Sequence, residues 1–342
     1  MADRYWVGGN NTWSSTAGTK WATTSGGTGG ASIPTSADDV FFTNLSTGPC
    51  IITATNTGAK SINCTGFTGQ ITGAGAISVY GNITLVAGMT YTHSGTVTFL
   101  DGGTLTTAGK TFSGLTIDAT GSTVTLGDAL NTGTRGIIVT QGNFNTANYN
   151  VTCNSFTSNN GNTRTITMGS GLWTITGILW QIASSNLTFN KDTANILFSD
   201  TSTTARSFFG GGLSYNKLTI GGTTGTSILS IFNINTFTEL ASTKTVAHTI
   251  SLNTNQTINT WSVTGTVGNI VTVNSSVVGT RRTITLTNAT SGIDYLSVQD
   301  IGIADVDKFY LGANSTDGGN NLNVYFTNQP VGGQSSNFFL LF

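Results

Sequence analysis

From about residue 50 onward, the chain is a succession of short apolar alternations, each ended by glycine or asparagine. Typical stretches read AISVYG, TVTFLDGG, RTITMG and LWTITG. Alternation with a period of two, followed by a turn residue, predicts a short β-strand and then a turn. The intervals between strands are too short for crossover helices, and proline, which interrupts sheet ladders, occurs only three times. This pattern leaves two folds, a β-solenoid or a series of antiparallel sandwiches.

A degenerate internal repeat favours the solenoid. Each copy has three bulky residues at the same spacing, then reaches a Thr-Gly or Thr-x-Gly turn. The bulky residues are Phe112, Leu115 and Ile117; Tyr215, Leu218 and Ile220; and Ile258, Trp261 and Val263. The copies are unevenly spaced, which stacked coils tolerate because insertions leave at the turns. We therefore predict an all-β fold, a β-solenoid resembling a parallel β-helix, with stacked β-sandwiches as the alternative.

Four segments follow from this interpretation. Residues 1–48 form an N-terminal aromatic cap or attachment segment, 49–210 the solenoid body, 211–300 a continued repeat-bearing β region, and 301–342 a closing β module with a tail. The first segment carries Trp6, Trp13 and Trp21. A solenoid end has unpaired strand edges and an open core that must be covered, so we interpret the tryptophans as a cap. A glycan-contact platform is the alternative, because indole faces stack on the apolar faces of sugars.

Composition narrows the partners. Charged residues make up 8% of the chain, against roughly 25% in an ordinary soluble domain. The near-neutral net charge of −1 argues against a nucleic-acid partner, since phosphate binding needs a basic surface. No apolar stretch approaches the length of a membrane span, so we expect no membrane insertion. The N-terminus shows no apolar signal core and cysteines are few and odd in number (Cys50, Cys64 and Cys153), which favours a reducing cytoplasm.

The search for catalytic residues yields weak candidates. Glycoside hydrolysis usually needs two carboxylates that face one cleft. Asp38 and Asp39 are adjacent, so in a strand they would point to opposite faces. A second group, which we interpret as a solvated turn and strand edge, consists of Asp294, Asp300, Asp305 and Asp307. His93 and His248 lie at no metal-ligand spacing, and no motif nominates a nucleophile, so we predict no catalytic residue, no metal and no cofactor.

The stretch GANSTDGGNN, residues 312–321, looks at first like an ion or phosphate site. It fails the EF-hand pattern and does not recur as calcium-binding β-roll repeats do. A lone calcium ion on Asp317 is one alternative. We interpret the stretch as a loop that reverses the chain before the final strand, with Asp317 capping backbone amides.

Several stretches resemble β-rich virion structural proteins of tailed bacteriophages, of the tail-fibre, receptor-binding or capsid-surface type and often marine. They are RYWVGGNNTW and GGTGGASIPTSADDVFF near the N-terminus, FFGGGLSYNKLTIGG in the middle, and WSVTGTVGNIVTVNSSVVGTRRTITL with FYLGANSTDGGNN towards the C-terminus. The closing module of that group usually ends in Gly-Trp before an aromatic strand, whereas here Asn321 is followed by LNVYF. The last strand is therefore expected to pack in its own way, with NFFLLF as a docking tail.

The resemblance implies a virion structural protein, a tail fibre, spike or adhesin-like appendage that contacts the host surface. A capsid decoration or head-fibre protein is a variant, and a polysaccharide depolymerase is the alternative from another class. The resemblance further implies assembly in the host cytoplasm into the virion, other virion proteins as neighbours, a homotrimer, and a host cell-surface glycan or receptor as partner. It carries over no catalytic residues.

Overall fold

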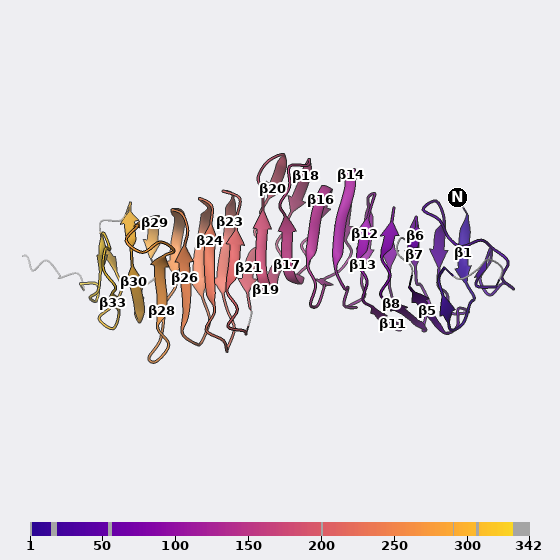
Figure 1. Cartoon of the computed structure of the whole chain (residues 1–342), viewed down its shortest axis with the longest axis horizontal. Helices are drawn as coiled ribbons and strands as arrows, with labels where there is room; N and C mark the ends of the chain where they lie inside the picture. Colours follow the sequence, from indigo (N-terminus) through magenta and orange to yellow (C-terminus); the bar gives the residue numbers. More distant parts are fainter. Residues whose placement is uncertain are drawn as a thin grey trace, which may run out of the picture.

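The computed structural model describes residues 2–14, 19–53, 57–199, 201–289, 291–305 and 308–330. These residues form strands and turns, and the ribbon shows the strands side by side along the long axis, in chain order from indigo to yellow (Figure 1). Within this part of the chain there is no helix capable of crossing a membrane.

The strands are short at the N-terminal end and longest in the middle. In chain order they are β1 (Asp3–Trp6), β2 (Asn11–Thr12), β3 (Trp21–Ala22), β4 (Asp39–Phe41), β5 (Pro49–Ile52), β6 (Thr57–Ala59), β7 (Ser61–Asn63), β8 (Gln70–Gly73), β9 (Ile77–Val79), β10 (Ile83–Thr84), β11 (Thr90–His93), β12 (Val97–Phe99), β13 (Gly103–Thr106), β14 (Leu115–Leu126), β15 (Leu130–Asn131), β16 (Ile137–Asn145), β17 (Val151–Ser158), β18 (Arg164–Thr167), β19 (Leu172–Ile182), β20 (Leu187–Asn190), β21 (Asn195–Phe198), β22 (Arg206–Phe209), β23 (Ser214–Ile220), β24 (Ile228–Phe232), β25 (Thr236–Ser242), β26 (His248–Leu252), β27 (Gln256–Ser262), β28 (Val271–Ser275), β29 (Arg282–Ala289), β30 (Leu296–Gln299), β31 (Ile301–Ala304), β32 (Phe309–Tyr310), β33 (Thr316–Asp317) and β34 (Val324–Tyr325).

Parallel pairing joins each strand to its equivalent on the next coil, as in the series β21, β23, β25 and β27. Many side-chain hydrogen bonds between neighbouring coils join residues 20 to 23 apart in the chain, and longer turns raise the separation to 28 or 30 between residues 255 and 294. Among the described strands, one pair, β1 with β3, is antiparallel. The predicted β-solenoid is therefore confirmed, and stacked sandwiches, which need antiparallel neighbours, are not formed.

Alternation along each strand places every second side chain in the core. One inward column runs through consecutive coils as Ile77, Val97, Leu115, Ile137, Phe156, Trp180, Phe208, Ile231 and Leu252, all buried. A second column, on another side, is Leu130, Val151, Trp173, Ile196, Leu218, Leu240 and Trp261. The sequence repeat therefore marks core positions, but its copies occupy two sides: Leu218 and Trp261 share a column, and Leu115 belongs to the other.

Parallel pairing continues across the expected boundaries at residues 210 and 300, where β21 pairs with β23 and β29 pairs with β31. At the C-terminal end, β32 and β34 also pair in parallel. The expected reversal of the chain at residues 312–321 is therefore wrong: this stretch carries the chain round into the next parallel strand, because a hairpin would have given antiparallel neighbours. The NFFLLF tail lies outside the described residues.

Candidate functional site: an uncharged groove along one edge

The three tryptophans of the first segment lie in the core. Trp13 and Trp21 contact each other edge to face at 4.8 Å between ring centroids, and Trp6 contacts Trp21 in the same way at 5.1 Å. Phe42 of the first coil packs about 6 Å from all three rings. Their side chains are at most 1% exposed, so no indole face is open for a sugar to stack on. This packing is the arrangement expected of a cap rather than of a glycan-contact platform.

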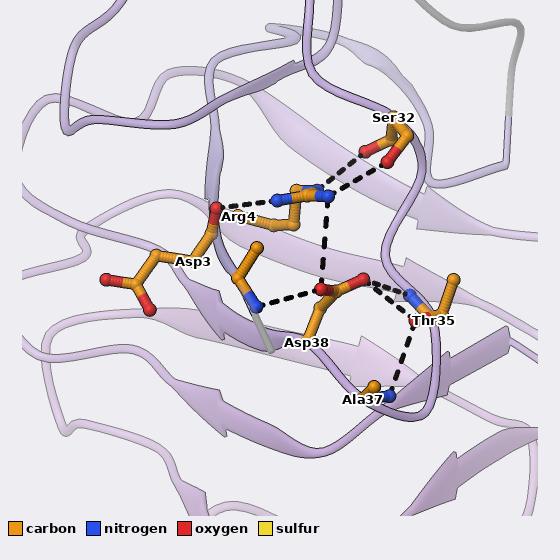
Figure 2. A network of polar contacts seen from close by, with 7 residues as sticks. Asp3, Arg4, Ser32, Thr35, Ala37 and Asp38 are labelled. Atoms are coloured by element: carbon orange, nitrogen blue, oxygen red, sulfur yellow. Dashed lines mark hydrogen bonds and ion pairs between the residues drawn. The ribbon is translucent and has the colours of Figure 1, made fainter.

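Asp38 holds a structural network rather than a cleft. Figure 2 shows its carboxylate between the first strand and the loop before β4. Oδ1 accepts a hydrogen bond from the backbone N of Ala2 at 3.1 Å and lies 3.9 Å from the Arg4 guanidinium. Oδ2 accepts from the backbone N and the hydroxyl of Thr35, at 3.0 and 2.8 Å, while Arg4 also donates to Ser32. The network fastens the N-terminal strand to the solenoid.

The neighbouring carboxylate does not join Asp38. Asp39 lies 3.7 Å from the ammonium of Lys60 and accepts a hydrogen bond from the hydroxyl of Ser61 on β7. The two acids therefore serve separate contacts, as their adjacent positions in the chain predicted. They do not form the facing pair that glycoside hydrolysis needs.

The Asp38 network makes stability at the N-terminal end depend on pH. Burial alone would raise the pKa of Asp38, but hydrogen bonds from Thr35, the charge of Arg4 and the Ala2 amide outweigh it and lower the pKa. A lowered pKa contributes stability that is present above the ordinary Asp pKa and is lost as pH falls through the folded-state value. Asp38→Ala should cost about 2 kcal/mol locally at neutral pH. Amide hydrogen exchange at Thr35 measures this; unchanged protection in the variant would contradict it.

The acids near the C-terminus are dispersed. Asp294 accepts hydrogen bonds from both the backbone N and the amide of Asn314, at 2.9 and 2.7 Å. Asp300 is buried and accepts from the backbone N of Gly279 at 3.0 Å, while Asp305 is exposed on a turn. Asp294 and Asp300 therefore each fix a separate loop. Asp307 lies outside the described residues.

Asp317 caps a turn, as the sequence predicted. Its Oδ1 accepts hydrogen bonds from the backbone N of Gly319 at 2.9 Å and from the Asn321 amide at 2.6 Å. In the described part of the chain, no three His, Cys, Asp or Glu side chains gather where they could hold a metal ion.

The two histidines are buried and far apart in the solenoid. His93 bonds through Nε2 with the carbonyl of Gly75 at 2.7 Å, and burial lowers its pKa. His248 bonds through Nδ1 with the Val246 carbonyl and through Nε2 with the Ser242 hydroxyl, both at 2.8 Å, and burial again lowers its pKa. With the imidazole only 3% exposed, this Ser–His contact is shut away from a substrate. The three cysteines are free and buried, and burial raises their pKa.

One edge of the solenoid, in contrast, is hollowed along much of its length. The residue after each member of the first inward column points outward, and these residues lie on consecutive coils. From the residue after Ile77 to the residue after Ile231 they are Ser78, Thr98, Thr116, Ile138, Thr157, Gln181, Phe209 and Phe232, and Gly58, which pairs with Ser78, extends the series by one coil. Two hollows include members of this column, and a third, between them along the chain, is lined by residues three or more positions beyond the column, after the coils turn the corner. We call the three together the edge groove.

The hollows follow one another along the chain. The N-terminal hollow, of about 330 Å³, is lined chiefly by Thr35, Ser36, Gly58, Ser78, Tyr80 and Leu100. The middle hollow, of about 460 Å³, is lined chiefly by Thr120, Gln141, Gly142, Asn143, Asn162 and Thr163. The distal hollow, of about 330 Å³, is lined chiefly by Asn159, Gln181, Ser184, Ser185, Phe209 and Asn233. Every coil from Gly58 to Asn233 contributes at least one residue to a hollow.

The corner backbone is built to stay open in the middle hollow. Gly142 has a φ of +82°, a conformation that L side chains rarely adopt. A Cβ at this position would also clash with the carbonyl oxygen of Ala119 on the preceding coil. Glycine therefore lets the two coils approach closely at this turn.

Aromatic and amide side chains give the distal hollow its chemistry. The Phe209 and Phe232 rings stack across neighbouring coils, with centroids 4.0 Å apart and planes within 14°, and both remain partly exposed. Asn159 and Gln181 line the same hollow, and within the described residues their side-chain amides have no hydrogen-bond partner. A ligand in this hollow could therefore contact the apolar ring of Phe209 and hydrogen-bond with the amides of Asn159 and Gln181.

No described residue that lines the three hollows carries a charge. Carboxylates lie beside the hollows: Asp38 accepts hydrogen bonds from Thr35 of the N-terminal hollow, and Asp118 pairs with Gln141 of the middle hollow. Asp101, which follows Leu100 of the N-terminal hollow, accepts hydrogen bonds from the Ser122 hydroxyl and the Gly102 backbone N. These bonds lower the pKa of Asp101, which therefore stays ionised near neutral pH.

Another hollow, of about 470 Å³, lies at the C-terminal end beside Lys308 and Tyr310. Its lining includes the cationic side chain of Lys308 together with Thr287, Asn288 and Gln329. The edge groove is the better candidate site, and it has to be interpreted from its own residues, because comparison with family models, curated proteins and solved structures found no match to this chain.

Proposed function

We propose that this chain is a non-enzymatic structural protein of a bacteriophage virion, a tail fibre, spike or adhesin-like appendage that contacts the host surface. The observation that carries the proposal is the edge groove: an uncharged surface, rich in hydroxyls and amides, along a rigid rod of stacked coils. A rod of this kind presents one surface over a long distance, because each coil adds to the same edge. The assignment to a phage particle comes from the sequence resemblance to virion proteins.

The groove favours binding over cleavage. Glycoside hydrolysis needs a pair of carboxylates that flank the scissile bond. The described lining of the groove holds none, and Asp38, Asp39, Asp294 and Asp300 are each engaged in separate contacts. A depolymerase would thus need acids beyond these residues. Release of new reducing ends from the host polysaccharide by the purified protein would contradict the non-enzymatic assignment.

Localisation on the particle tests the main proposal. We expect gold-labelled antibody against the chain to decorate the tails of particles of the phage that encodes it, together with other virion proteins. Labelling confined to the head would move the assignment to a capsid decoration or head fibre, and particles without the chain would overturn it.

We also expect a homotrimer, with a light-scattering mass of three times the chain's 35.4 kDa. A monomeric mass would contradict the trimer.

A further inference from the structure

We propose that the edge groove binds a single extended, uncharged glycan chain that lies parallel to the long axis of the solenoid. This inference rests on the proposed function in that it names the partner of the host-contact surface. The groove, its direction and its chemistry nevertheless come from the residues alone, so the glycan can be tested without the virion.

The direction follows from the hollows. They lie beside an outward column in which each residue pairs with the next coil, from Gly58 through Gln181 to Phe232. Neighbouring strands in a sheet are about 4.8 Å apart, so nine consecutive coils span about 40 Å. One coil step is close to the length of one sugar residue in an extended chain. A straight polymer can therefore meet an equivalent position on each coil, whereas a compact ligand would use one hollow only.

The chemistry of the lining matches a sugar. Pyranose rings have apolar C–H faces, which pack on aromatic rings, and hydroxyls around the rim that need donors and acceptors. Phe209, which lines the distal hollow and stacks on Phe232 of the next coil, supplies an apolar face there, and Tyr80 supplies an aromatic ring in the N-terminal hollow. The unpartnered amides of Gln181 and Asn159 stand beside Phe209 in the distal hollow. Small apolar faces with a few convergent polar groups are typical of ligand sites.

The uncharged lining of the edge groove favours uncharged glycan chains over anionic ones. The described lining offers no cation to pair with a uronic acid, a sialic acid or a phosphate. The ionised Asp101 lies on the edge between two of the hollows, where it would repel a polyanion laid across it. Neutral hexose or N-acetylhexosamine chains meet no such repulsion.

Calorimetric titration of the purified full chain tests the inference. The probes are cellohexaose and chitohexaose, which are neutral and straight, with maltohexaose as a neutral but coiled comparison and an alginate hexamer as an anionic one. We expect at least one straight neutral hexaose to bind more tightly than both comparisons. Phe209→Ala should weaken that binding about tenfold, the effect of losing one aromatic contact.

Two further variants test whether a loss of binding comes from misfolding and whether the hexaose binds in the edge groove. Gln181→Ala removes an amide from an outward position without disturbing the aromatic stack, and it should also weaken the hexaose. Tyr310 lines the separate C-terminal hollow and packs against Tyr325. Tyr310→Ala should therefore leave binding of the hexaose to the edge groove unchanged. Binding of neither straight hexaose, a preference for alginate or maltohexaose, or loss of binding in Tyr310→Ala alone would overturn the inference.

The outcome is separable from that of the proposed function. If the chain is found on the virion but binds neither straight hexaose, the assignment as an appendage is kept and the inference of glycan binding is rejected. A chain absent from particles that binds a straight hexaose through Phe209 would do the reverse.

Discussion

Replacing Trp180 by alanine is expected to lower the free energy of unfolding by about 4 kcal/mol, as the loss of a fully buried tryptophan usually does. The indole is fully buried in the first inward column. Its ring lies 4.6 Å from Phe156 and 5.5 Å from Trp173, and it stacks at 6.0 Å on Phe208 of the next coil. Alanine would leave a cavity that these rings cannot close, because each is held by its own strand ladder.

Urea unfolding followed by far-UV circular dichroism measures this loss, since the β signal does not depend on the removed indole. Trp180→Phe keeps an aromatic ring and should lose clearly less than alanine. Ile178→Ala, on the same strand but 48% exposed, should stay within about 0.5 kcal/mol of the parent. Equal stability of the alanine variant and the parent would show that the aromatic layer does not hold neighbouring coils together.

The class of fold could be predicted because its signal is local. Stretches such as RTITMG and LWTITG show the alternation within a few residues, and each became a strand, β18 and the start of β19. The coil length was harder to see. The recognised repeat joins Leu218 to Trp261 across two coils, while Leu115 lies in another column, so the copies gave no single period. Coil boundaries are marked only by degenerate turn residues, which carry little periodic information.

The candidate site could not be predicted, for a physical reason. Each coil gives the edge groove a short run of one to five residues, the runs lie about 20 or more positions apart in the chain, and none of these residues is charged. Gln141, Gln181 and Asn233 look like ordinary turn or strand-edge residues until the coils are stacked. The three tryptophans drew attention because they are conspicuous in sequence, yet large aromatic surfaces are most often buried.

Arg164 is the other residue whose role the sequence concealed. It opens β18 and would be expected to face solvent, but it is only 1% exposed. Its guanidinium donates through Nε to the Ser158 hydroxyl at 2.6 Å, and through Nη1 to the carbonyls of Asn162 and Ser185, both at 2.8 Å. Nη2 donates to the carbonyls of Ser158 and Ala183. The planar guanidinium of Arg164 thus connects the corner loops of two successive coils, between the middle and distal hollows.

Arg164→Met should therefore lower the free energy of unfolding by at least about 3 kcal/mol, because several buried acceptors lose their donors at once. Arg164→Lys keeps the charge but not the fork, and it should fall between Met and the parent. We expect both variants to weaken the straight hexaose under conditions in which circular dichroism shows them folded, since the loops that carry Asn162 and Ser185 form the groove walls.

The matched control is Arg135→Met, which removes an exposed arginine from a neighbouring corner and should change stability by no more than about 0.5 kcal/mol. Denaturant unfolding and hexaose titration on the same samples separate the two roles of Arg164. If Arg164→Met lost stability but bound the hexaose as the parent does, the fork would hold the coils without shaping the groove. If it lost neither, water would have to replace the guanidinium at all its acceptors, and the corner loops would not depend on it.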